Sequence, residues 1–259
     1  MAQQLAGCLA PPVCALCGGP GQWLDEPWGL DLCIHCEAAC RRAPVEPLPF
    51  DAAFCLFQYR DPVDQMITRL KFQHELSFAR VLGTLFARAR RAADLPMPEC
   101  LVPMPLHRGR YRERGFCQTT ELARHIAWRL RDARGRRLPI RTGLLTRVRA
   151  TSAQSGLSAA DRGRNLLGAF AANAQGRPPR HVALLDDVLT TGHTATAAAA
   201  ALRAIGVARV EIWCCARALR DNAGPDTAGT CPSPEPPWPP QTNASPPTPR
   251  HPAGSSTTS

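Results

Sequence analysis

Two adjacent carboxylates, Asp186 and Asp187, follow a short apolar run and precede a turn rich in threonine and glycine. The apolar run, residues 182–185, has the β-branched and leucine composition of a buried parallel strand. The alanine-rich segment 195–205, closed by Gly206, predicts a helix. The turn would open that helix, where backbone N–H groups lack internal partners and the helix dipole is positive, so it predicts a phosphate site. The residues of this turn are Thr190, Thr191, Gly192, His193 and Thr194.

The acidic pair indicates what accompanies the phosphate. Carboxylates repel a bare phosphate, but they accept hydrogen bonds from the two hydroxyls of a ribose diol. Because ligands bind at the carboxyl ends of parallel strands, we expect a sugar phosphate with its hydroxyls toward Asp186 and Asp187 and its 5′-phosphate over residues 190–194. The alternative is that the acidic residues only cap a turn at the end of a strand.

A second constellation lies near the N-terminus, where two C-x2-C pairs are formed by Cys14, Cys17, Cys33 and Cys36. This spacing predicts a structural Zn²⁺ held by four thiolates. The segment between the pairs is rich in glycine and proline and too short to form a core of its own. The alternatives are buried free cysteines or disulfides, and a redox site would need a strand and helix that the flanking residues do not predict. His35 and Cys40 could substitute for an unused thiolate.

Three segments of the chain carry a resemblance to known proteins. The carboxylate segment resembles the signature of type I phosphoribosyltransferases, which bind 5-phosphoribosyl 1-pyrophosphate. Residues 100–118, CLVPMPLHRGRYRERGFCQ, resemble the PVP strand end and RGFNQ segment of the competence protein ComF family. Residues 145–170 are similar to a further stretch of that family, with matches at Arg147, Gln154, Leu157, Ser158, Arg162, Asn165, Gly168, Ala169 and Phe170. With the N-terminal cysteines, the resemblance spans roughly residues 14–220.

The resemblance implies an α/β fold with a type I phosphoribosyltransferase-like parallel sheet flanked by helices and a small N-terminal zinc ribbon built on the four cysteines. It also implies that Mg²⁺ accompanies the pyrophosphate of the ligand. Asp186 and Asp187 would then be the catalytic carboxylates, and arginines after the strand ending at residues 103–105 would clamp the pyrophosphate. The residues expected there are Met104, Pro105, Arg108 and Arg114.

The chain departs from the family pattern at three positions. Met104 replaces a valine, which is a swap of core-sized side chains. Cys117 stands where the family has asparagine and lacks that residue's amide donor and acceptor. His193 replaces a small residue of the phosphate loop, where it either adds a cation when protonated or points to solvent.

Lys71 resembles a family lysine that ends a helix, and it either reaches the ligand phosphate or only complements the helix dipole.

Hydrophobic patterning supports the mixed fold. We expect strands at residues 54–59, 100–102, 182–185 and 210–214, alternating with helices. Asp61 and Pro62 are expected as N-cap and first residue of a helix over residues 63–71. Leu122, Ile126 and Leu130 predict one stripe of a second helix, and Ser158 with Asp161 predicts a capping box.

Composition sets outer limits. The 259 residues suffice for a zinc-ribbon module (1–50), a phosphoribosyltransferase-like domain (51–220) and a disordered tail rich in Pro, Ser and Thr (221–259). No apolar run is long enough to span a membrane, and with no secretory signal and metal-like cysteine spacing we expect a cytoplasmic protein. The net charge of +10 suits a polyanion partner, but an arginine excess could also reflect a GC-rich coding sequence. The arginine-rich stretch 129–149 is a candidate phosphate-tracking surface, although a solvated face is the favoured interpretation.

Two classes of function remain open. The chain either binds 5-phosphoribosyl 1-pyrophosphate or a nucleotide 5′-phosphate without turnover, or it is an active phosphoribosyltransferase of nucleotide metabolism with an unidentified acceptor. ComF proteins are associated with incoming DNA in natural transformation, so the resemblance implies single-stranded DNA and the DNA-uptake machinery as partners. A ligand-sensing regulator fits least, because no helix-turn-helix is recognisable.

Overall fold

The computed structural model describes residues 11–24, 29–45, 48–132, 135–149, 168–174 and 176–219. The chain divides into two units, Met1–Arg220 and Asp221–Ser259. The expected tail, the capping box at Ser158 and Asp161, and the family matches from Gln154 to Asn165 lie outside the described residues. Among the described residues, no helix combines the length and apolarity that crossing a bilayer requires.

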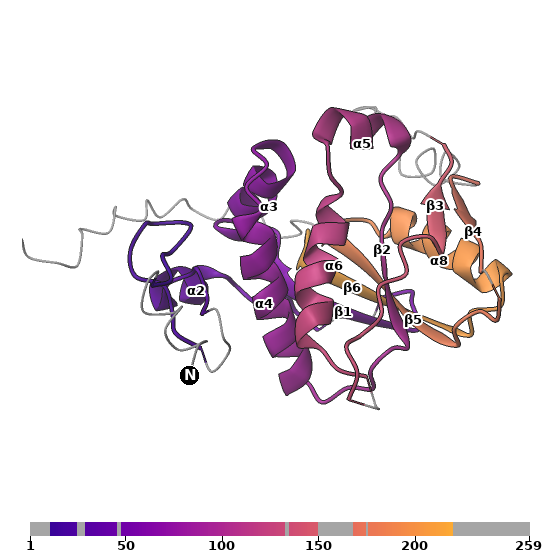
Figure 1. Ribbon diagram of the computed structural model, residues 1–259, viewed down its shortest axis with the longest axis horizontal. Coiled ribbons are helices and arrows are strands. Elements are labelled where there is room, and N and C mark those ends of the chain that lie inside the picture. The colour runs from indigo at the N-terminus through magenta and orange to yellow at the C-terminus, as the bar shows by residue number, and fades with distance from the viewer. Residues whose placement is uncertain are drawn as a thin grey trace, which may run out of the picture. The chain divides into compact units, whose positions relative to one another are not determined.

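A parallel sheet of four strands forms the centre of the first unit (Figure 1). Its order is β1-β6-β5-β2, with β1 at Ala52–Gln58, β6 at Arg209–Arg217, β5 at His181–Leu189 and β2 at Cys100–Pro103. Side chains along β5 alternate between two cores, because successive residues of a strand point to opposite faces. Leu185 belongs to one core and Leu184 to the other, as expected of a parallel sheet covered on both sides.

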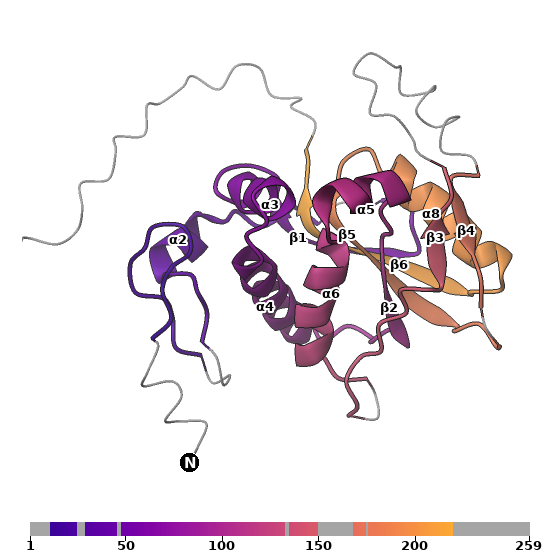
Figure 2. The same ribbon diagram turned by 45° about the horizontal axis from the view of Figure 1, so that its top comes forward.

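One face of the sheet is covered by three helices (Figure 2). They are α3 (Val63–Phe72), α4 (Ser77–Ala92) and α6 (Gln118–Arg129). On α4 the buried apolar residues Phe78, Leu82, Leu85 and Phe86 recur at helical spacing. The core on this side also contains Trp213 of β6, whose ring centroid lies 5.3 Å from that of Phe86.

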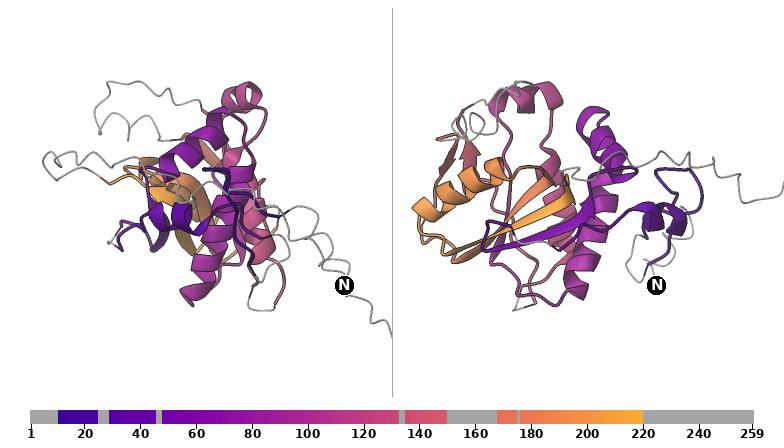
Figure 3. Two further views of the ribbon diagram at one scale, coloured as in Figure 1. Left: turned by 90° about the vertical axis from the view of Figure 1, so that its left-hand side faces the viewer. Right: turned by 180° about the vertical axis from the view of Figure 1, so that it is seen from behind.

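The opposite face is covered by α8 (His193–Ala204), as the reverse view in Figure 3 shows. Ala195, Ala198 and Leu202 of α8 pack there against β5 and β6. The small side chains of the two alanines allow the helix to approach the sheet closely. An antiparallel pair, β3 (Leu145–Arg147) and β4 (Phe170–Ala172), packs beside α8.

The described residues of this unit also form two short helices. Helix α5 (Arg108–Arg114) follows β2 and ends at Gly115, which has φ 74°. Helix α2 (Ile34–Ala39) lies in the cysteine segment. The left-handed conformation at Gly115 ends α5 after two turns without strain, since glycine lacks a Cβ atom.

The expected parallel sheet with flanking helices is confirmed, but several boundaries were wrong. Strand β5 does not stop at Leu185; it continues through both carboxylates to Leu189, because Val188 and Leu189 extend the apolar pattern. Pro62 is the N-cap of α3 and no side chain caps this helix, so Asp61 is not the N-cap. Helices α4 and α5 were not among the expected elements.

Candidate functional site

The two carboxylates lie where β5 extends past its neighbour β2. The last backbone contact between these segments is the hydrogen bond from Met104 N to Leu185 O, 2.8 Å long. Asp186 and Asp187 come directly after it and point to opposite faces of the sheet. Each carboxylate accepts the backbone N–H of the next residue at 2.9 Å. The expected pair is therefore held in fixed orientation at the carboxyl edge of the sheet.

Asp187 is partnered on the α3 side of the sheet. Its Oδ2 lies 2.6 Å from Nζ of Lys71, near the end of α3, and only 4% of the Asp187 surface is exposed. Burial lowers the pKa of Arg114, and the negative charge of Asp187 opposes that shift. Arg114 also donates to Gln118 Oε1 at 2.6 Å. Lys71 thus contacts a carboxylate, which neither expectation for this lysine included.

Asp186 lies on the other face, toward β3. Burial raises the pKa of its carboxyl to about 8, and the neighbouring charge of Asp187 acts in the same direction. Arg147, at the end of β3, is near enough for the charge of Asp186 to oppose the fall in pKa that burial causes in its guanidinium. The guanidinium lies 5.5 Å from the ring centroid of Phe170. The sequence marks Arg147 only as a family match and assigns it no site role.

The threonine-glycine turn connects β5 to α8 as expected. Gly192 is the N-cap of α8 with φ 79°, and no side chain occupies the cap. Thr190 and Thr191 are exposed. The side chain of His193 lies within the loop, with Nδ1 3.3 Å from Thr191 Oγ1. The uncapped first turn of α8 and the hydroxyls of the threonines in this turn together offer hydrogen-bond donors to an anion.

Of the residues expected to hold the pyrophosphate after β2, only some have side chains that line a pocket. Met104 is 5% exposed, so its side chain belongs to the core, while its carbonyl accepts the Thr119 hydroxyl at 2.7 Å. Pro105, Arg108 and Arg147 line a pocket of about 440 Å³ between the start of α5 and β3. Cys117 is the N-cap of α6 but provides no side-chain cap.

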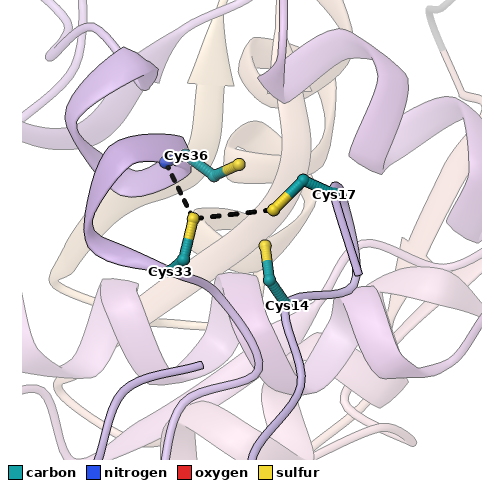
Figure 4. A group of neighbouring side chains, drawn as sticks. All are labelled: Cys14, Cys17, Cys33 and Cys36. Atoms are coloured by element: carbon teal, nitrogen blue, oxygen red, sulfur yellow. Dashed lines mark hydrogen bonds between the residues drawn. The ribbon is translucent and has the colours of Figure 1, made fainter. Parts of the chain in front are cut away.

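The four cysteines expected to bind metal come together (Figure 4). Their Sγ atoms, from Cys14, Cys17, Cys33 and Cys36, all lie within 4.8 Å of one another. The Sγ atoms of Cys17 and Cys33 are 3.7 Å apart, and a tetrahedral site with Zn–S bonds of about 2.3 Å has sulfur–sulfur edges of about 3.8 Å. The donor set therefore fits a closed metal site. Cys40, one of the two suggested substitutes, instead directs its thiol to Cys36 O at 3.3 Å.

The segment that contains the four cysteines packs on the side of the sheet covered by α3 and α4. Cys14, Leu30 and Leu32 belong to the same hydrophobic core as α3 and α4. Helix α4 adds ion pairs from Arg80 to Asp31 and from Arg88 to Glu37. The cysteine cluster and the sheet thus share buried surface.

The covered parallel sheet, the carboxylate pair at its edge and the threonine-glycine turn define a type I phosphoribosyltransferase-like α/β protein with an N-terminal four-cysteine cluster. The chain belongs to the ComF family of competence proteins. It is 32% identical to Competence protein F of Haemophilus influenzae over 213 residues, covering 80% of this chain and 85% of the relative. It is also 34% identical to DNA utilization protein YhgH of Escherichia coli K12, covering 71% of this chain and 80% of the relative.

Solved structures and family models add little to this assignment. Hypoxanthine phosphoribosyltransferase of Trypanosoma cruzi aligns at 14% identity over 64% of this chain and 86% of that chain, with a TM-score of 0.31. The Staphylococcus aureus enzyme aligns at 13% identity over 52% and 61%, with a TM-score of 0.30. Scores this low carry no argument. No family model matches the chain.

Proposed function

We propose that the carboxyl edge of the sheet binds 5-phosphoribosyl 1-pyrophosphate or the 5′-phosphate end of a nucleotide. The observation that carries this proposal is the pair of oriented carboxylates on β5, followed at once by the open N-terminus of α8. Asp186 and Asp187 accept the ribose hydroxyls, and residues 190–194 donate to the 5′-phosphate. A mere turn cap would not require two carboxylates within the strand itself.

The cations around the carboxylates suit a pyrophosphate. Arg108 and Arg147 line one pocket beside the pair, and Lys71 and Arg114 lie on the other face. Carboxylate oxygens and pyrophosphate are ligands that Mg²⁺ prefers, and the ion would neutralise charge on the pyrophosphate. The partly buried Asp186 fits this role, because a nearby divalent cation favours its ionised form.

We further propose that the chain acts on single-stranded DNA during natural transformation, in the cytoplasm and together with the DNA-uptake machinery. The support is the names of the relatives, Competence protein F and DNA utilization protein YhgH. In this role the pocket recognises a nucleotide or 5-phosphoribosyl 1-pyrophosphate without turnover.

The second candidate is an active phosphoribosyltransferase of nucleotide metabolism. It is favoured by the position of Asp186 and Asp187 between two groups of cations, since carboxylates stabilise an oxocarbenium-like ribose while arginines stabilise the departing pyrophosphate. An acceptor bonds to C1 of the ribose as the bond to pyrophosphate breaks. None of the described residues identifies that acceptor.

For the cysteine cluster we propose a structural Zn²⁺. Four thiolates leave no open coordination position for a reaction. The support is geometric, because the four Sγ atoms all lie within 4.8 Å of one another, as ligands of one ion must.

Calorimetric titration with 5-phosphoribosyl 1-pyrophosphate and Mg²⁺ tests the pocket, and an assay for pyrophosphate release separates the two candidates. Asp186→Asn combined with Asp187→Asn should weaken binding at least about 30-fold, or about 2 kcal/mol, while circular dichroism remains unchanged. Asp94→Asn, which changes an exposed carboxylate elsewhere, should bind as the parent does. Because Asp187→Asn removes the partner of Lys71, Asp186→Asn alone is the second variant. Equal affinity of all variants would refute the pocket.

A further inference from the structure

A second pocket lies at the opposite edge of the sheet from the carboxylates. It has a volume of about 550 Å³, and its lining includes Cys100, the first residue of β2, and Arg180, which directly precedes β5. In a parallel sheet these positions share the amino edge, whereas Asp186 and Asp187 lie near the carboxyl end of β5. The two sites are therefore separated by the length of the strands.

The lining of this pocket is strongly basic. Arg141, Arg177 and Arg180 contribute three exposed guanidinium groups, and among the described residues no carboxylate forms an ion pair with any of them. Among the described lining residues Glu99 is the one acid, and both of its carboxylate oxygens accept the backbone N–H of Arg180 at 3.3 Å. Burial raises the pKa of Cys100 to about 11, so its thiol is neutral. The site carries a net positive charge.

The backbone around the arginines is held in place. Leu101 N donates to Pro139 O at 2.8 Å, and Arg141 N donates to Leu101 O at 2.9 Å, which attaches this wall to β2. The carbonyl of Arg180 accepts N–H groups from Ala208 and Arg209 at 3.1 and 2.8 Å, which attaches the other wall to the start of β6. Pro178 and Pro179 further restrict the chain between Arg177 and Arg180. A pocket held in this way loses little entropy when it binds a ligand.

We propose that this amino-edge pocket binds phosphate groups. Guanidinium groups form bidentate hydrogen bonds with phosphate oxygens, and three of them around one cavity repel each other until an anion neutralises them. Two sources share this chemistry: a free polyphosphate, such as that of a nucleoside triphosphate, and the backbone of single-stranded nucleic acid. The proposal does not depend on ligand binding at Asp186 and Asp187.

The test compares the full chain with two triple variants of equal charge. The pocket variant carries Arg141→Gln, Arg177→Gln and Arg180→Gln. The control variant carries Arg42→Gln, Arg124→Gln and Arg203→Gln, which change exposed arginines outside both sites. Sodium tripolyphosphate is titrated by calorimetry, and a fluorescent oligothymidylate by anisotropy over a range of salt concentrations.

The pocket variant should lose at least about tenfold in affinity for one or both probes, while the control variant binds as the parent does. If the oligothymidylate is the ligand, the slope of log K against log salt should fall by about 2, since each phosphate contact with a single strand contributes about 0.7. Loss for tripolyphosphate alone assigns a free phosphate ligand, and loss for the oligothymidylate assigns the nucleic-acid backbone. If the parent binds neither probe, or both triple variants bind alike, the proposal is wrong.

Titration of the same variants with 5-phosphoribosyl 1-pyrophosphate and Mg²⁺ distinguishes this inference from the proposed function. The pocket variant should keep the parent's affinity for that ligand, because the carboxyl edge is unaltered. Failure of the parent to bind it would contradict the proposed function and leave the amino-edge result intact.

Discussion

Asp186 and Asp187 are neighbours in sequence, yet the sheet gives them different environments. Asp187 is buried against Lys71, which compensates its charge. The pKa of Asp186 is raised by burial and by the charge of Asp187, so its carboxyl is costly to ionise. The alternation of side chains along a strand is what separates the two roles.

Asp186→Asn should stabilise the protein without ligand, and the gain should increase with pH. Because the native pKa is raised from 3.8 to about 8, the native state keeps the proton longer than the unfolded state does, and stability falls as pH rises through this window. Asparagine cannot ionise, so the variant avoids that loss, which we expect to be about 1–2 kcal/mol at pH 8 for this partly exposed group.

Thermal unfolding at pH 5 and pH 8 in magnesium-free buffer measures this effect. The melting temperature of Asp186→Asn should exceed that of the parent more at pH 8 than at pH 5. Asp94→Asn is the control for loss of an exposed carboxylate. A pH-independent difference would contradict the stated environment of Asp186.

At the scale of elements, the connection from β5 to α8 depends on one backbone position. Gly192 has φ 79°, and a Cβ atom added there would lie 3.2 Å from Phe50 Cζ. A side chain at this position is therefore disfavoured by conformation and by a close contact.

Gly192→Ala should cost about 1–2 kcal/mol of stability and weaken phosphate-ligand binding, since strain moves the first turn of α8. Gly143→Ala is a matched control, because its added Cβ would meet nothing within 4 Å and its φ is not positive. Denaturant unfolding and calorimetric titration of both variants measure the difference. Equal behaviour of the two variants would show that the turn tolerates a side chain.

The elements that the sequence predicted well are those with a local signal. The strand, the turn and the alanine-rich helix around Asp186 follow from apolar runs and glycine placement, and the cysteine spacing alone predicted the cluster. Helix α5 was missed because it is basic and has no buried residue. The contact of Lys71 with Asp187 and the proximity of Arg147 to Asp186 join distant segments, so no local pattern could reveal them.

At the scale of the whole molecule, the cysteine cluster and the sheet are connected through one hydrophobic core. Cys14 and Leu30 pack in the same hydrophobic core as Leu70 and Phe86. The sequence predicts a separate module over residues 1–50, and this division stays a prediction. The shared core nevertheless implies that a substitution which disrupts the cysteine cluster also lowers the stability of the sheet.

Cys14→Ser should remove the metal and lower the melting temperature of the sheet by several degrees, because a buried ligand and its core contacts are lost together. Native mass spectrometry should find about one zinc ion in the parent and none in this variant. Cys117→Ser, which alters a thiol outside the cluster, should retain the metal. A metal-free parent, or a Cys14→Ser variant with full zinc content, would contradict the assignment.

The ion pair between Lys71 and Asp187 has a consequence for how a ligand enters the carboxyl edge. A ligand hydroxyl that donates to Asp187 Oδ2 competes with an ammonium group 2.6 Å away, and a displaced cation would remain beside the site on α3. Binding there is therefore an exchange of partners within the protein rather than a net addition of charge. Salt should affect this step only weakly, whereas the arginines of the amino edge form no ion pair within the described part of the chain and must draw counterions from solution.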